Sequence, residues 1–239
     1  MTRPNGLHHV AISTGDMKEQ IAYFSDVLGM KLQALYWMHG VPKTFHGFMM
    51  MGDEAVAFVF NEEIKGTATT MGQTHAGNAG AASAPGTMQH IAFNVDSLDA
   101  LLAMRDRIRS RGINVMGPLN HGMCHSIYFA GPENLSLEIA TSGAAENPLD
   151  AKGTWIDPEV VALAGINEDE LKRYMEPAEY TNHGDALPNP GIDPAKPQMT
   201  YPEGSLEMII SAPDEAMLNR VESAPPSPGG LSKKNVKRP

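Results

Sequence analysis

Apolar and polar positions alternate in short stretches along the first part of the chain. After one such stretch, residues 7–12, apolar residues recur three or four positions apart at Ile21, Phe24 and Val27, the spacing of an amphipathic helix. Three further strand-like stretches follow, at residues 31–36, 44–51 and 55–60. The pattern therefore predicts the element order β-α-β-β-β over about residues 6–62.

The same order returns in residues 87–142. The motif Leu7-His8-His9-Val10-Ala11-Ile12 is matched 81 residues later by Met88-Gln89-His90-Ile91-Ala92-Phe93. A helical pattern then ends near Gly112, as the first ends near Gly29, and glycine suits the left-handed turn after a helix. Strand-like stretches follow at residues 114–116, 124–129 and 136–140. We predict an α+β domain in residues 1–145, built from two β-α-β-β-β modules joined by the Gly-rich loop 63–86.

Proline density separates this domain from the rest of the chain. Five of the 18 prolines lie in residues 1–147 and the other 13 in residues 148–239. Proline interrupts both helices and sheets, so we expect residues 146–239 to form an extended Pro-rich C-terminal arm. One short helix is predicted in the arm, from Pro158 to about Met175, with Asp157 as its N-cap. The arm would wrap the domain or contact a second subunit.

Charge and composition narrow the class of partner. The chain carries 18 Lys and Arg against 28 Asp and Glu, for a net charge of −10. Nucleic acids and anionic membranes are therefore unsuitable partners, and the basic residues at 233–238 are too few to change this. A single cysteine, the absence of a signal-like N-terminus and the lack of an 18-residue apolar run favour a cytoplasmic protein. We expect a homo-oligomer, most simply a homodimer, that acts on a small molecule.

Three residues suggest a metal centre. His9 and His90 occupy the same position of the repeat, so they lie on equivalent strands and faces. Glu138 lies between Leu137 and Ile139, where a buried carboxylate is costly unless it is paired or bound to a metal. Two imidazoles and one carboxylate suit non-haem Fe²⁺ with open positions. Hydrogen-bonded structural histidines and a solvent-facing Glu138 are the alternatives.

The repeat and these residues resemble the paired modules of the vicinal oxygen chelate superfamily, which includes glyoxalase I, extradiol dioxygenases, epimerases and antibiotic-resistance proteins. The resemblance covers about residues 6–142 and implies that His9, His90 and Glu138 bind one metal. In the members that are glyoxalase I or epimerases, four protein ligands hold the metal. Aligning the strand at 55–60 with the strand that carries Glu138 puts Phe58 near the position of Glu138. This strand therefore offers no fourth ligand. Three ligands leave room for a bidentate substrate and O2, which favours the extradiol branch.

The stretch from His121 to Glu138 resembles the extradiol ring-cleavage signature in its His, Tyr, Pro and Glu spacing. Leu119, Gly131 and Asn134 depart from that signature. The resemblance implies that Tyr128 hydrogen-bonds a substrate oxygen and that His121 lines the pocket.

Extradiol enzymes usually carry an acid–base histidine near the end of the first module, and this chain has none there. His46 is a candidate substitute, as is His75. We predict an Fe²⁺-dependent extradiol dioxygenase that cleaves a catechol-like small aromatic with O2. Mn²⁺, Zn²⁺ and Ni²⁺ are alternative metals. A glyoxalase-like lyase or isomerase and a metal-free small-molecule binding protein are the alternative functions.

Overall fold

The computed structural model describes residues 3–149, 152–181, 184, 186–220 and 223–226. They divide into two compact units, one within residues 4–178 and one within residues 179–226 together with residue 3. The basic residues at 233–238 lie outside the described part of the chain. Among the described residues, no helix is both long and apolar enough to cross a membrane.

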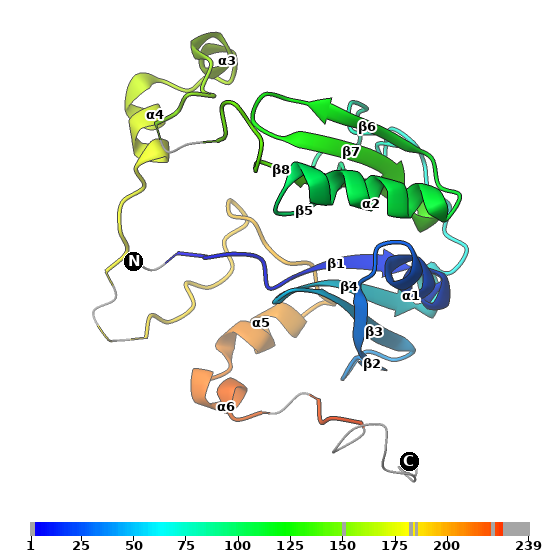
Figure 1. Cartoon of the computed structure of the whole chain (residues 1–239). Helices are drawn as coiled ribbons and strands as arrows, with labels where there is room; N and C mark the ends of the chain where they lie inside the picture. The colour runs from blue at the N-terminus through cyan, green and yellow to red at the C-terminus, as the bar shows by residue number, and fades with distance from the viewer. Residues whose placement is uncertain (1–2, 150–151, 182–183, 185, 221–222, 227–239) are drawn as a thin grey trace. The chain divides into compact units, whose positions relative to one another are not determined.

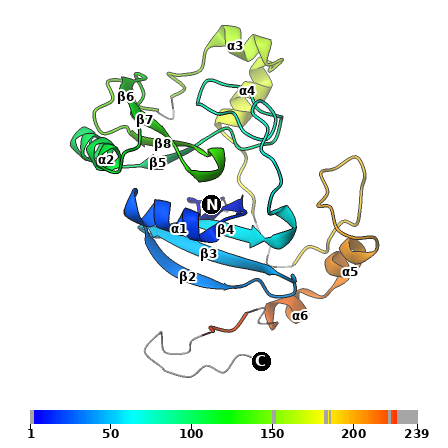
Figure 2. The same ribbon diagram turned by 90° about the vertical axis from the view of Figure 1, so that its right-hand side faces the viewer.

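The first module forms a four-stranded sheet and one helix, drawn in blue to cyan in Figure 1. Its sheet has the order β1-β4-β3-β2, in which β1 and β4 run parallel and the other pairs antiparallel. The Asp16 carboxylate accepts a hydrogen bond from the Glu19 N–H and starts the helix, and Gly29 is left-handed just after its end. Figure 2 shows this helix across one face of the sheet. The elements are β1 (His9–Thr14), α1 (Met17–Asp26), β2 (Lys31–Trp37), β3 (Thr44–Met51), β4 (Glu54–Asn61) and the 3-10 turn η1 (Glu62–Ile64).

The second module, green in Figure 1, repeats this topology with the strand order β5-β8-β7-β6. Ser97 caps its helix by accepting a hydrogen bond from the Ala100 N–H, and Gly112 is left-handed beyond the helix. The predicted pair of β-α-β-β-β modules is therefore confirmed. The elements are β5 (Ile91–Asn94), α2 (Leu98–Ser110), β6 (Val115–Asn120), β7 (His125–Ala130), η2 (Pro132–Asn134) and β8 (Ser136–Thr141).

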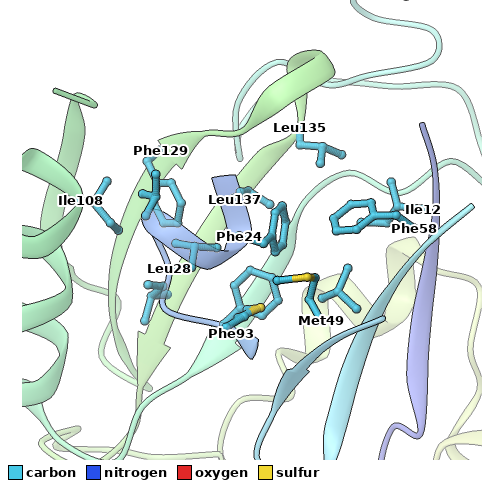
Figure 3. Packing of buried hydrophobic residues seen from close by; sticks show 14 of the residues in the cluster. Ile12, Phe24, Leu28, Met49, Phe58, Phe93, Ile108, Phe129, Leu135 and Leu137 are labelled. Atoms are coloured by element: carbon cyan, nitrogen blue, oxygen red, sulfur yellow. The ribbon is translucent and has the colours of Figure 1, made fainter. Parts of the chain in front are cut away.

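One hydrophobic core serves both modules (Figure 3). The ring of Phe24 from α1 packs 4.8 Å from Phe58 of its own module and 6.2 Å from Phe93 of the other, measured between ring centroids. Each sheet contributes alternate residues to this core, because successive strand residues point to opposite faces. We call the other face of each sheet, turned away from α1 or α2, its helix-free face.

The second module also binds both ends of α1. Glu133 accepts hydrogen bonds from the Gly15 N–H (2.7 Å) and the Gln20 amide (2.7 Å) at the start of this helix. Arg107 donates to the carbonyl oxygens of Val27 (2.7 Å) and Asp26 (3.1 Å) at its end. An anion at the N-terminus and a cation at the C-terminus complement the helix dipole, so these contacts stabilise the pairing of the modules.

The C-terminal region is more helical than predicted. The prediction of a single helix from Pro158 to Met175 is wrong. Gly165 has a left-handed conformation that ends one helix, and Asn167 starts a new helix with a capping box. The first compact unit also extends to residue 178, beyond the expected boundary at 145. The helices of this region are α3 (Pro158–Leu163), α4 (Glu168–Met175), α5 (Ser205–Ser211) and α6 (Asp214–Leu218).

Candidate functional site

Two of the three candidate ligands meet on the helix-free face of the second sheet. Leu137 and Ile139 point into the core, so Glu138 between them points to the other face. Its Oε2 lies 2.8 Å from Nε2 of His90, and its side chain is 7% exposed. His90 immediately precedes β5 rather than lying within it. The pair is a buried carboxylate facing an imidazole nitrogen.

The other ring nitrogen of His90 is also engaged. Its Nδ1 contacts Oε1 of Gln89, and an amide oxygen only accepts, so Nδ1 is the donor in this contact. Gln89 in turn donates to the carbonyl oxygens of Asn78 (3.0 Å) and Ala81 (3.1 Å) in the Gly-rich loop. Such a contact orients Nε2 toward Glu138, as partners of metal-binding histidines commonly do. The sequence analysis gave Gln89 no role, although it aligns with His8 in the repeat.

Tyr128 lies beside this pair. It is directly opposite Glu138 in the β7–β8 register, and its ring centroid is 6.2 Å from that of His90. Its hydroxyl lies 3.1 Å from Nε2 of His121, in the turn before β7. Burial raises the pKa of the Tyr128 phenol, and the nearby Glu138 charge raises it further. Tyr128 is therefore a neutral hydrogen-bond donor at physiological pH.

His9 and His46 lie on the helix-free face of the first sheet. His9 is exposed, its Nδ1 lies 2.8 Å from Nδ1 of His8, and its ring is 5.6 Å from Phe48. His46 has an Nδ1 that is buried without a hydrogen-bond partner among the described residues. Burial lowers the pKa of His46, and the charge of His9 lowers it further, so His46 is neutral at pH 7.

An aromatic surface accompanies these histidines. The rings of Tyr36 and Phe48 are stacked at 6.2 Å with an interplanar angle of 10°, and His46 lies edge-on to both. The sequence analysis did not assign this surface. Alternation along β2 and β3 is the signal that was available, because Tyr36 and His46 are cross-strand partners.

The three candidate ligands do not converge within one chain. Among the residues that the structure describes, no group of three or more His, Cys, Asp or Glu side chains could hold a metal ion. His90 and Glu138 nevertheless suit one. Ligands at right angles about one ion, at the usual metal–ligand distances of about 2.0–2.2 Å, lie about 3 Å apart. The separation of 2.8 Å between the His90 nitrogen and the Glu138 oxygen is close to this value.

The equivalent of Glu138 in the first module is Ala57, not Phe58. Ala57 pairs with Ala11 in the β1–β4 register as Glu138 pairs with Ala92 in the β5–β8 register. Phe58 points into the core and is fully buried. The sequence comparison was shifted by one residue, which exchanges the two faces of a strand. Ala57 has no ligating atom.

One family model and several solved structures are similar to this chain. The family model for the Glyoxalase/Bleomycin resistance protein/Dioxygenase superfamily matches residues 6–157. No match was found among curated proteins. Similar solved structures include three bacterial proteins. One is a glyoxylase/bleomycin resistance protein/dioxygenase domain from Frankia sp. EAN1pec, with 15% identity over 58% of this chain and 93% of that one and a TM-score of 0.46. Another is lactoylglutathione lyase from Agrobacterium tumefaciens, with 17% identity over 58% of this chain and 95% of that one and a TM-score of 0.41. The third is the fosfomycin resistance protein FosX from Listeria monocytogenes, with 16% identity over 57% of this chain and 91% of that one and a TM-score of 0.41.

The family match spans both modules and the segment that follows them. It covers well over half of the 239 residues. The chain therefore belongs to the Glyoxalase/Bleomycin resistance protein/Dioxygenase superfamily.

Proposed function

We propose that this protein is a metal-dependent extradiol dioxygenase that cleaves a catechol-like small aromatic with O2. The observation that carries the proposal is the His90–Glu138 pair, which shares one face with the hydrogen-bonded Tyr128 and His121. Fe²⁺ is the proposed metal, with Mn²⁺, Zn²⁺ and Ni²⁺ as alternatives. When bound, the metal supplies an electrophilic centre that holds both reactants next to each other.

A second copy of the chain would complete the ligand set. Within one chain, the shared core lies between the helix faces, so both helix-free faces are turned away from it. His9 is exposed, and its Nε2 has no hydrogen bond or ion pair among the described residues. We infer a homodimer in which the partner subunit's His9 joins His90 and Glu138. The stacked Tyr36 and Phe48 beside His9 would then supply a flat apolar surface for an aromatic ring.

The remaining residues would position the substrate and move protons. Tyr128 has one O–H to donate, so a substrate oxygen would take the place of His121 as its acceptor. His121 is then free to accept a proton or to bind a second substrate oxygen. His46 is neutral at pH 7 and has an unused buried nitrogen, which suits a general base.

The test is to load the purified protein with each metal and measure ring cleavage and O2 consumption over a panel of catechols. Ring cleavage with one bound metal in the presence of air, and none without O2, is expected. Metal-dependent lyase or isomerase turnover without O2 would replace the proposal with the glyoxalase-like alternative. Tight small-molecule binding with no bound metal would identify a binding protein. Sedimentation of wild type and His9→Ala, each with and without metal, tests the dimer.

A further inference from the structure

The turn between β6 and β7 is covered by a residue from outside the module repeat. This turn carries His121 and Gly122, and Gly122 is left-handed with a φ of 80°. A Cβ on Gly122 would lie 2.8 Å from Cη2 of Trp155. Trp155 follows the second module by 14 residues and donates from Nε1 to the carbonyl oxygen of Asn147 at 2.8 Å. The indole ring therefore rests directly on the Gly122 backbone.

Two hydrogen bonds, one from the main chain and one from a side chain, also join the same segment to the turn. The Asn147 N–H donates to the Gly122 carbonyl at 3.3 Å, and the Ser142 hydroxyl donates to the Met123 carbonyl at 3.1 Å. Within the turn, the His121 N–H donates to the Cys124 carbonyl at 2.9 Å. Ser142, Asn147 and Trp155 thus contact the turn, in addition to the bonds that the turn makes by itself.

None of the described residues covers the matching turn of the first module in this way. Gly40 lies between β2 and β3 and has a φ of 74°, close to that of Gly122. A Cβ on Gly40 would meet no atom of the described residues within 4 Å. The two glycines therefore share a backbone requirement and differ in the presence of an aromatic ring above one of them.

We propose that Trp155 is a positioning residue, which holds the β6–β7 turn so that the His121 ring reaches the Tyr128 hydroxyl. The ring of Trp155 limits the positions that Gly122 can take, and Gly122 is bonded directly to His121. The catalytic consequence rests on the proposed function, whereas the mechanical one does not. Trp155 is 46% exposed, so its side chain can be removed without opening the core.

The mechanical part is tested by amide hydrogen exchange and NMR on the full chain. Trp155→Ala should speed exchange at residues 121–124 about fivefold or more, the order expected for losing one net hydrogen bond. Gly122→Ala should do the same, because its methyl displaces the ring, whereas the matched Gly40→Ala should change only residues 38–43. The His121 ring resonances in Trp155→Ala should move toward their positions in Tyr128→Phe. Unchanged exchange at 121–124 in Trp155→Ala, or unmoved His121 resonances, would overturn the proposal.

The catalytic part is tested by turnover at full metal content. Trp155→Ala should lower kcat about 5- to 20-fold with little change in KM, and Trp155→Phe, which keeps a ring over Gly122, should recover most of it. A Trp155→Ala variant with faster exchange but wild-type kcat would refute the positioning role. A wild type that cleaves no catechol would remove the proposed function, while exchange and the His121 resonances would still decide the mechanical role.

Discussion

Where the second module carries Glu138, the first module carries Ala57, and where the second carries Tyr128, the first carries Phe48. The backbones at these positions pair in the same way. The helix-free face of the second sheet therefore presents a carboxylate and a phenol. The corresponding face of the first sheet presents His46 and an aromatic surface without any carboxylate.

This difference teaches how one module can serve two purposes. Both modules contribute apolar side chains to the shared core, and this packing keeps the modules together. The helix-free faces are not bound by that requirement, so their chemistry can diverge. The second module supplies a carboxylate and a phenol, and the first supplies imidazoles and flat aromatic rings. The first face has an exposed histidine but no carboxylate, and the second has the carboxylate, which is the basis for proposing that the two faces meet in a homodimer.

The largest expected effect comes from making the second module resemble the first. Loss of a residue that only hydrogen-bonds a metal ligand lowers metal affinity roughly 10- to 100-fold, and Glu138→Ala, which removes a ligand itself, should lower it by more. Metal content after dialysis measures this, and Glu63→Ala, an exposed carboxylate of the first module, is the control. His9→Ala and His90→Ala belong to the same series. Near-stoichiometric metal in any two of the three ligand variants would rule out the set.

The two faces of one strand pair should differ in their contribution to stability. Phe58 is fully buried in the shared core, so Phe58→Ala should lower the free energy of unfolding by about 3–5 kcal/mol. Phe48 is only partly buried on the helix-free face, so Phe48→Ala should cost clearly less. Urea denaturation of both variants gives the comparison. Equal losses would mean that the helix-free face also belongs to the core.

Removing the phenol oxygen tests the chemistry of the second face. Tyr128→Phe should leave the bound metal in place and cost about 1–3 kcal/mol at the transition state, or about 5- to 150-fold in rate. Catechol turnover and metal content are measured side by side. Full activity on every catechol that the wild type cleaves would reduce Tyr128 to a packing residue.

The smallest effect concerns the contact between the modules. Burial alone would raise the pKa of Glu133, but hydrogen bonds from Thr14, Gln20 and the Gly15 N–H outweigh it and hold the pKa below its ordinary value of 4.5. A lowered pKa in the folded state adds stability above pH 4.5, and that stability is lost as the pH falls through the folded-state pKa. Glu133→Gln should therefore cost about 1 kcal/mol at pH 7, since solvent screens this partly exposed group.

The difference between Glu133→Gln and wild type should shrink below pH 4 in denaturation series at several pH values. Glu146→Gln, at an exposed carboxylate, is the matched control and should change little at any pH. A constant difference from pH 7 to pH 3 would show that shape rather than charge matters at Glu133.

Most of the fold was predictable from the sequence, and the errors have local causes. The strands of the first module begin and end within two residues of their predicted bounds, because alternation and turn residues act locally. The helix expected from Pro158 to Met175 failed because Gly165 stops one helix and Asn167 starts another. The predicted alignment of Phe58 with Glu138 was wrong by one residue, because the apolar residues of this strand do not show which face each side chain takes.

The sequence by itself determined the two modules, the glycines that end their helices and the equivalence of His9 with His90, because each depends on residues close together in the chain. Tertiary structure decided which side chains meet. Pairing of β5 with β8 brings His90 to Glu138, and packing of both helix faces into one core leaves His9 on another surface. Likewise, only the folded chain lays Trp155 on Gly122, since a contact across 33 residues leaves no periodic signal in the sequence.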